Sequence, residues 1–325
     1  MNYGNVAGIG KPVSRVVLGT MVINRQARAN SYDLLDTALR LGVNTFDMAH
    51  VYGGGDTERC IGDWLADRGC RDRVVLITKG AIPNADRPRV TPYDIEADLH
   101  DSLTRLRVPS VDLYFLHRDN PRVPVGPVVE ALDRLRREDK ITAYGGSNWT
   151  HPRLQEANDY AKKHGLAPFA ASSPNFGLAE QVDNPWGPGC VTLSGPEHKE
   201  ARAWYAANHM PIFAYSSLAR GLFSGRVDPD CTDPNHPTHP AKALDGAALQ
   251  AYAHPVNFER LRRVAKYAKT HNLAIPLVAL AWLLHHPLDT YALVGPDTAK
   301  ELTQLTEALT IKLPPADLAH MNLEE

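Results

Sequence analysis

The chain has 325 residues, with 35 Lys or Arg against 37 Asp or Glu, and its formal net charge is −2. This near-neutral balance argues against a protein that binds nucleic acid or a membrane surface, because phosphate groups are bound by a basic face. No apolar run approaches a membrane span of about 18 residues, and residues 1–12 lack the apolar core of a signal peptide, so we expect a cytoplasmic protein.

Eight short segments rich in Val, Ile and Phe predict buried strands. In chain order they cover residues 16–19, 43–46, 74–78, 111–116, 141–145, 168–172, 211–215 and 290–294. Apolar residues at helical spacing predict the helices between and after them. These helices cover residues 30–41, 57–67, 91–106, 126–138, 151–164, 196–208, 257–271, 277–285 and 298–308.

Continuous apolar strands joined by helical crossovers indicate a parallel sheet that is buried on both faces. Eight such units in about 300 residues predict the α/β class and a closed (β/α)8 TIM barrel, as a single domain over residues 1–325. The alternative is an open doubly wound sheet, which with a nucleotide would carry G-x-G-x-x-G after the first strand. The sequence there, GTMVINRQ at residues 19–26, does not match.

The two longest irregular stretches are predicted at residues 175–194 and 224–254, which are rich in Gly, Pro, Asn and His. They follow the sixth and seventh strands, where a barrel carries active-site loops. Surface insertions without a function are the alternative interpretation.

Polar or ionisable residues stand where four of the strands end, and a tyrosine follows on a Gly-rich loop. These residues are Asp47, Tyr52, Lys79, His117 and the pair Ser147-Asn148. Each one alone has an ordinary structural explanation, such as capping or solvation. Because the carboxyl ends of barrel strands meet at one mouth, the set together indicates a catalytic site.

The chemistry of this set is that of proton donation to a carbonyl group. A tyrosine has a pKa near 10, so Tyr52 needs a nearby cation to stabilise its phenolate. Lys79 can provide that charge, and Asp47 can hold Lys79 in place. His117 can donate a hydrogen bond that orients the substrate oxygen. No side chain supplies a hydride, so a cofactor must do so.

These residues lie within longer motifs, and through them the chain resembles the aldo-keto reductase family over nearly its full length. The motifs are LGTM at 18–21, D-x-x-x-x-Y from Asp47 to Tyr52, TKG at 78–80, DLYFLHRD at 112–119, GGSNW at 145–149 and AYSSLARGLFSG at 214–225. The resemblance implies an NADP(H)- or NAD(H)-dependent oxidoreductase that reduces a small-molecule aldehyde or ketone, including a sugar or sugar-derived carbonyl.

The resemblance also implies individual roles. Tyr52 would be the general acid, Lys79 and Asp47 its tuning pair, and His117 the group that orients the carbonyl. Among the cofactor contacts, Ser147 and Asn148 would hold the nicotinamide carboxamide and Tyr215 would stack on the ring. The full set of implied cofactor contacts is Gly19, Thr20, Met21, Asp47, Ser147, Asn148, Ser173, Tyr215, Ser216, Leu218, Arg220, Gly221, Gly295, Asp297, Lys300 and Glu301.

Two positions depart from the family pattern. Ser173 stands where the family usually has a glutamine, so one contact to the carboxamide is expected to be shortened or mediated by water. The loop after the last strand carries Asp297 and Glu301 with only Lys300 basic, where the family commonly binds the 2′-phosphate with a Lys or Arg. A carboxylate there repels a phosphate and favours NAD(H). If Asp297 instead caps the following helix, its charge is turned away, and Lys300 or Arg220 can still take the phosphate.

Three other functions compete with carbonyl reduction. The same site could run in the oxidative direction as a sugar or polyol dehydrogenase, or the chain could be a cofactor-sensing partner subunit. A metal-dependent hydrolase would need clustered ligands at strand ends. The candidate histidines stand instead on a helix end, at 285 and 286, and on a Pro-rich loop, at 236 and 239. The four cysteines form no C-x-x-C pair, so we expect reduced thiols and no metal site.

Five aromatic residues stand in the loops, and each is expected to pack inward rather than to contact a ligand, although an aromatic mouth would suit an aldehyde, a ketone or the face of a sugar. The residues are Trp149, Phe176, Trp186, Phe223 and His254. The sequence is compatible with a monomer and with a homo-oligomer.

Overall fold

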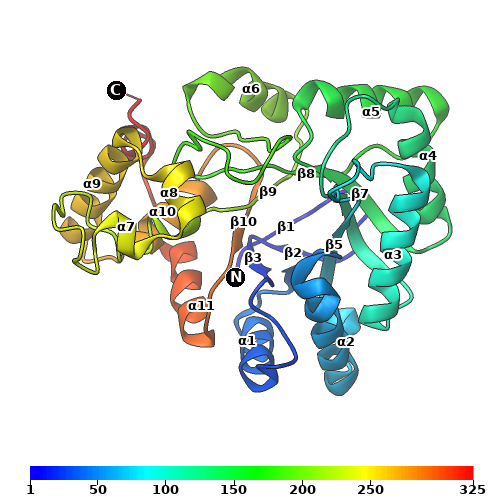
Figure 1. Cartoon of the computed structure of the whole chain (residues 1–325), viewed down its shortest axis with the longest axis horizontal. Helices are drawn as coiled ribbons and strands as arrows, with labels where there is room; N and C mark the ends of the chain where they lie inside the picture. The colour runs from blue at the N-terminus through cyan, green and yellow to red at the C-terminus, as the bar shows by residue number, and fades with distance from the viewer. Residues whose placement is uncertain (325) are drawn as a thin grey trace.

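The computed structural model describes residues 1–324, in which eight parallel strands form a closed barrel (Figure 1). The strands are β3 (Val16–Gly19), β4 (Thr45–Asp47), β5 (Val75–Gly80), β6 (Val111–Leu116), β7 (Ile141–Ser147), β8 (Ala171–Ser173), β9 (Ile212–Ala214) and β10 (Thr290–Val294). Each strand pairs in parallel with its neighbour in the chain, and β10 pairs with β3 to close the barrel. The predicted (β/α)8 barrel is confirmed, and the open doubly wound sheet is wrong.

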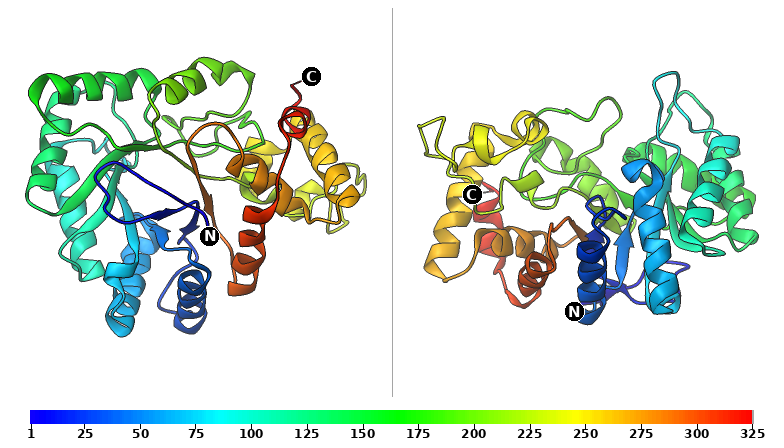
Figure 2. Two further views of the ribbon diagram at one scale, coloured as in Figure 1. Left: turned by 180° about the vertical axis from the view of Figure 1, so that it is seen from behind. Right: turned by 60° about the horizontal axis from the view of Figure 1, so that its bottom comes forward.

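Helices surround the barrel, as Figures 1 and 2 show. They are α1 (Arg28–Leu41), α2 (Asp56–Arg68), α3 (Pro92–Leu106), α4 (Val125–Arg137), α5 (His151–His164), α6 (Lys199–Ala207), α9 (Pro255–Thr270), α10 (Ile275–Leu284) and α11 (Ala299–Thr306). Local chemistry fixes several of their ends. Helix α3, for example, starts where the side chain of Thr91 accepts a hydrogen bond from the Asp94 amide, with Pro92 in the first turn.

The sequence analysis missed a hairpin at the N-terminus, formed by β1 (Tyr3–Gly4) and β2 (Val13–Ser14). Val6, Ile9 and Val13 from this segment are buried in the same cluster as the side chains that fill the barrel. In the left view of Figure 2 the dark-blue segment crosses the barrel. The hairpin therefore seals the end of the barrel at which the strands begin.

Two further corrections concern loops. The stretch at residues 224–254 is not wholly irregular, because it contains α7 (Pro240–Ala243) and α8 (Gly246–Tyr252). Each starts at a side chain that accepts an amide hydrogen bond, from His239 for α7 and from Asp245 for α8. A last helix, α12 (Pro315–Met321), also follows the helix at which the prediction ended.

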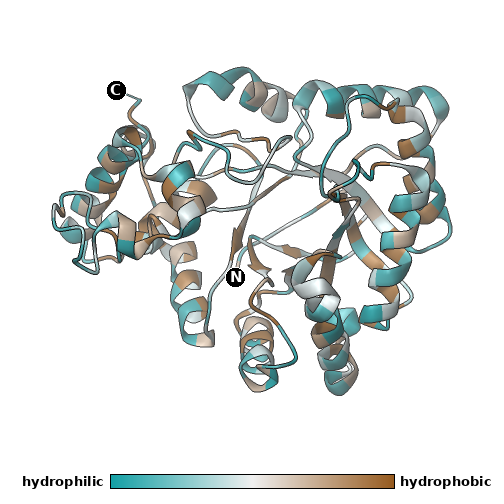
Figure 3. Ribbon diagram, viewed as in Figure 1, coloured by the Kyte–Doolittle hydropathy of each residue, from teal (hydrophilic) through white to brown (hydrophobic). Residues whose placement is uncertain are grey.

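Alternation along the strands decides which side chains enter the barrel. Successive residues point to opposite faces, and the inward set forms one apolar cluster. Its strand members are Val17, Val75, Ile77, Leu113, Phe115, Ala143, Ala171, Phe213, Tyr291 and Leu293. In Figure 3 the strands are mostly brown, and teal marks the outer faces of the helices. No helix within residues 1–324 combines the length and apolarity needed to cross a membrane.

The inward positions become polar at the carboxyl ends of the strands. The register pairs Gly19 with Asp47, and Ser147 with Ser173. Lys79 follows two residues after the inward-facing Ile77, so it shares the same parity. The predicted strand-end residues therefore point into the barrel at one end, above the apolar cluster.

Helices α2 and α3 pack closely at Gly62 of α2, next to the loop that carries Tyr52. A Cβ atom there would lie 2.6 Å from the carbonyl oxygen of Arg105 and 2.8 Å from that of Leu106. We predict that Gly62→Ala lowers the free energy of unfolding by about 1–3 kcal/mol, although alanine is the better helix former. Urea unfolding measures this change.

Gly246→Ala is the matched control, because nothing lies within 4 Å of the Cβ position at the start of α8. This variant should stay within about 0.5 kcal/mol of the wild type. Equal effects of the two substitutions would contradict the close approach of α2 and α3.

Candidate active site

A Gly-rich loop carries Tyr52 from the end of β4 to the start of α2. The glycines at 53, 54 and 55 have φ angles of 55°, 61° and 88°, a region that residues with a Cβ atom rarely adopt. The side chain of Arg105, on α3, fixes this loop through hydrogen bonds. Its Nη1 donates to the carbonyl oxygen of His50 at 2.8 Å and to Oε2 of the buried Glu58 at 3.1 Å.

Lys79 and Asp47 form an ion pair inside the barrel. Lys79 Nζ lies 2.5 Å from Asp47 Oδ2, and each side chain is only 4% exposed. The ammonium also donates to the carbonyl oxygen of Met48 at 2.9 Å, and it lies 5.3 Å from the ring centre of Tyr52. Two of its three donors are thus used by the pair and the backbone, which leaves one for the phenol.

Burial and charge set the protonation of this group. Burial raises the pKa of Tyr52 above its ordinary value of 10.0, and the charge of Lys79 opposes that shift. Burial alone would lower the pKa of Lys79, but attraction by Asp47 and Tyr52 outweighs it, so that pKa lies above 10.5. At neutral pH the site therefore holds a protonated phenol beside a charged ammonium.

His117 completes the group from the end of β6. Its ring lies 6.1 Å from that of Tyr52, at an interplanar angle of 81°. Burial, together with the charges of Lys79 and Arg118, lowers the pKa of His117 well below 6.5. The imidazole is therefore neutral at neutral pH and carries one N–H donor. A neutral imidazole and a protonated phenol can both donate to one carbonyl oxygen.

A second group of polar side chains lies on the neighbouring strands. Ser147 Oγ donates to the carbonyl oxygen of Ser173 at 2.9 Å, and Asn148 Nδ2 donates to Ser147 Oγ at 3.1 Å. The phenol of Tyr215 donates to Asn148 Oδ1 at 2.7 Å. The hydroxyl of Ser173 is fully buried and lacks a hydrogen-bond partner within residues 1–324. An unpaired buried hydroxyl costs free energy, so this set fits a ligand with an amide group.

Hydrogen bonds to carbonyl oxygens of the barrel strands fix the segments that flank these two groups of side chains. Thr20 Oγ1 donates to the carbonyl oxygen of Asp47 at 2.8 Å, whereas the next residue, Met21, is 67% exposed. After β9, Ser217 Oγ donates to the carbonyl oxygen of Leu293 at 2.5 Å. Backbone hydrogen bonds form a turn around Ser217, which carries the remaining predicted contacts on this segment, namely Ser216, Leu218, Arg220 and Gly221.

The loop after β10 resolves the capping alternative. The helix cap is Thr298, whose Oγ1 accepts from the amide of Glu301 at 3.2 Å. The Glu301 carboxylate in turn accepts from the amide of Asp297 at 2.9 Å. Capping by Asp297 is therefore wrong, because Thr298 occupies that position and the carboxylate of Asp297 is exposed. Gly295 is exposed on the same loop, and Lys300 is exposed in the first turn of α11.

The packing expected for the aromatic residues of the loops is confirmed for three of the five. Trp149, Phe176 and Phe223 are at most 1% exposed. They belong to the hydrophobic cluster that is separate from the one filling the barrel interior. Trp186 is partly exposed and packs against Tyr252, with ring centres 6.1 Å apart. Periodicity in a loop cannot separate an aromatic residue that packs inward from one that faces a ligand, so burial had to decide.

The sequence analysis assigned no role to Arg118 and Cys190, which the structure brings together. Arg118 Nη2 donates to Cys190 Sγ at 3.3 Å, across 72 positions of the chain. The available signal was the place of Arg118 directly after His117 at a strand end. Within residues 1–324 no three His, Cys, Asp or Glu side chains are grouped so that they could hold a metal ion.

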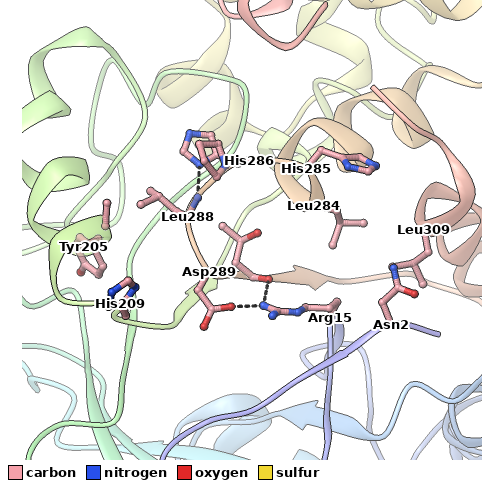
Figure 4. Close-up of a pocket in the computed structure, with 13 residues that line it drawn as sticks. Asn2, Arg15, Tyr205, His209, Leu284, His285, His286, Leu288, Asp289 and Leu309 are labelled. Atoms are coloured by element: carbon pink, nitrogen blue, oxygen red, sulfur yellow. Dashed lines mark hydrogen bonds and ion pairs between the residues drawn. The ribbon is translucent and has the colours of Figure 1, made fainter. Parts of the chain in front are cut away.

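Two cavities, of about 540 and 820 Å³, lie at the opposite end of the barrel. The smaller one is drawn in Figure 4, where Arg15 pairs with Asp289 at the start of β10. The guanidinium of Arg15 also lies 4.3 Å from the ring centre of Tyr291. None of the predicted site residues lines either cavity, and these contacts explain Arg15 as part of the barrel's closed end.

Known proteins match this chain over most of its length. A family model described as the aldo/keto reductase family matches residues 15–322. YrpG of Bacillus subtilis strain 168, named as an uncharacterized oxidoreductase, is 29% identical over 99% of this chain and 95% of its own length. The aldo-keto reductase YhdN of the same strain is 27% identical, over 94% and 88%. Aryl-alcohol dehydrogenase GME11368 of Pestalotiopsis microspora is 26% identical, over 89% and 70%.

The low pKa of His117 predicts a stability cost in acid. Below pH 6.5 the unfolded chain binds a proton at this residue that the folded chain does not, so the free energy of unfolding falls with pH. The slope is about 1.4 kcal/mol per pH unit until the folded-state pKa is reached. We predict that His117→Asn removes this contribution and flattens the profile, as measured by urea unfolding at about pH 7, 6 and 5.

His117→Gln is the second variant, because it is also neutral but fills more of the space. Both variants should give the same shallower slope even if their absolute stabilities differ. A slope equal to that of the wild type in both would contradict a neutral, buried His117.

Proposed function

The chain belongs to the aldo/keto reductase family of oxidoreductases, and on that premise we propose that it reduces an aldehyde or ketone to the alcohol with a nicotinamide cofactor. One observation carries the proposal. Tyr52 lies next to the buried ion pair of Lys79 and Asp47. The centre of its ring is 6.1 Å from that of His117, whose imidazole is neutral. This is a proton donor, its stabilising cation and a second hydrogen-bond donor at one end of the barrel.

Each residue of the site has its own role in the proposed reduction. His117 and Tyr52 donate hydrogen bonds to the substrate oxygen and so polarise the carbonyl bond. The bound cofactor supplies the hydride that reaches the carbonyl carbon. Tyr52 gives its proton to the oxygen, and the charge of Lys79 stabilises the phenolate that remains. Asp47 keeps Lys79 charged and in place.

The cofactor would be held by the second polar group. Ser147, Asn148 and the unpartnered hydroxyl of Ser173 would bind the carboxamide, and Tyr215 would stack on the ring. Gly19, Thr20 and Met21 would lie at the other edge of the ring. The turn after β9 would follow the pyrophosphate, with Ser216, Leu218, Arg220 and Gly221 as its contacts.

We further propose a preference for NAD(H) over NADP(H). Asp297 on the loop after β10 and Glu301 in the first turn of α11 put two carboxylates where the adenosine ribose would lie. A carboxylate within about 4 Å makes the binding free energy of a phosphate less favourable by about 1–4 kcal/mol. A helix N-terminus makes it more favourable by only about 0.3–1 kcal/mol. Arg220, which could otherwise take a phosphate, is paired with Asp245 at 2.8 Å.

The same residues can catalyse the reverse reaction, with the phenolate of Tyr52 taking a proton from an alcohol. A sugar, polyol or aryl alcohol would then be oxidised. A cofactor-sensing partner subunit would instead bind the cofactor without turnover. Loss of the absorbance of the reduced cofactor in the presence of a carbonyl compound separates an enzyme from such a subunit.

The assignment of the acid predicts the effect of Tyr52→Phe. General acid catalysis contributes about 10²–10⁴-fold, so kcat for carbonyl reduction should fall by at least a hundredfold. Cofactor binding, measured by quenching of protein fluorescence, should stay within a few-fold of the wild type, because the ring is kept. Tyr93→Phe, an exposed tyrosine on α3, is the control and should not change kcat. Near-normal turnover by Tyr52→Phe would refute the assignment.

Cofactor choice is tested on Asp297. Wild-type protein should bind NADH more tightly than NADPH, and Asp297→Arg should tighten NADPH about 10- to 100-fold by adding a charged hydrogen bond. The control is Glu307→Arg, the same charge change at an exposed residue beyond the far end of α11. Dissociation constants for both cofactors decide the matter. A wild type that binds NADPH a hundredfold more tightly, unchanged in Asp297→Arg, would show that this acid has no part in selection.

A further inference from the structure

Arg118 stands directly after His117, where the chain leaves β6. Its side chain is only partly exposed and is fixed at two points. Nη1 donates to the carbonyl oxygen of His117 at 2.9 Å, and Nη2 donates to Cys190 Sγ at 3.3 Å. Cys190 belongs to the long loop after β8. The guanidinium therefore spans from one strand end to the loop of another and forms part of the wall of the mouth.

The charge of the guanidinium acts on the groups to which we assign the reaction. Its positive charge opposes protonation of His117 and favours the phenolate form of both Tyr52 and Tyr215. These three rings come from different strand ends. The hydrogen bonds of Arg118 to the His117 carbonyl oxygen and to Cys190 Sγ keep its charge at this end of the barrel.

This positive charge has no carboxylate partner within residues 1–324. The adjacent acid, Asp119, is taken by Arg153 at 3.1 Å, and Asp47 is taken by Lys79. A guanidinium has five N–H donors, and only two of those of Arg118 are used. A partly buried charge without a counter-charge is costly, and an anionic ligand would remove that cost.

We propose that Arg118 binds a carboxylate on the substrate, so that the site selects aldehydes or ketones that carry an acidic group. This inference rests on the function proposed above. A carboxylate matches the arginine fork with two oxygens and a single charge. A phosphate monoester, with a charge of about −1.5 to −2, would call for a second free cation, and Lys79 is already neutralised by Asp47.

The rest of the rim suits the body of such a substrate. Met21 and Val51, on the loops after β3 and β4, are 67% and 43% exposed. Val51, which directly precedes Tyr52, offers apolar surface that would cover an apolar spacer between the carbonyl and the acid. Binding energy from the remote carboxylate would then help to orient the reacting carbon.

The test compares each acid with its methyl ester, which removes the charge but keeps the carbonyl. Two pairs with different spacers are used, 4-formylbenzoate and 4-oxobutanoate, each with its ester. The wild type should show a kcat/KM ratio of acid to ester of about 10 to 100, the value of a charged hydrogen bond. Arg118→Met should bring the ratio near one, and Arg118→Lys should retain part of it.

Arg122→Met is the matched control, because this arginine is exposed and lies outside the wall of the mouth on the same loop. It should keep the wild-type ratio. Calorimetric binding of 4-(hydroxymethyl)benzoate, the alcohol product, to the NAD⁺-loaded protein gives a second readout, and Arg118→Met should weaken it at least tenfold. Arg118→Lys keeps the measurement decisive if Arg118→Met fails to fold.

The outcomes separate this inference from the function on which it rests. Equal acid-to-ester ratios in the wild type and in Arg118→Lys, with the esters still reduced, would overturn the inference and leave the proposed function standing. A wild type that prefers glyceraldehyde 3-phosphate over both acids would overturn the carboxylate assignment. No oxidation of NADH or NADPH with any of these compounds would overturn both.

Discussion

The buried ion pair between Lys79 and Asp47 is the contact on which the site depends. Two charges inside a barrel carry a large desolvation cost, which is offset only where the geometry is close and the remaining donors are satisfied. The 2.5 Å contact and the hydrogen bond to the Met48 carbonyl offset part of that cost, whereas Asp47 Oδ1 is buried without a hydrogen-bond partner among residues 1–324. The pair keeps a cation beside Tyr52 without leaving net charge in the interior.

The barrel makes this arrangement possible through alternation and register. Asp47 and Lys79 enter the interior because they share the inward parity of their strands, and the apolar layers beneath them exclude water. The N-terminal hairpin closes the other end. The two ends thus differ in role: one is packed for stability, and the other presents polar side chains on loops that a rigid scaffold supports.

Charges farther from the reaction centre are arranged differently from the central pair. Arg118 is partly exposed and has no acidic partner within residues 1–324, whereas Asp297 is exposed on the loop after β10 and Glu301 is exposed in the first turn of α11. In our proposal they select ligands by attraction and by repulsion respectively, whereas the central residues act on the bond that changes. Separating the two tasks lets specificity vary without disturbing the buried pair.

The sequence by itself determined the order of strands and helices and the polar residues at four strand ends. Those features depend on local periodicity and on where an apolar run stops, which neighbouring residues encode. It did not determine the hairpin, because two strands of two residues each show no pattern. It also overlooked Arg118. Which side of a loop a ring packs against, and which distant thiol meets a guanidinium, depend on barrel closure and strand register, and only the tertiary structure sets those.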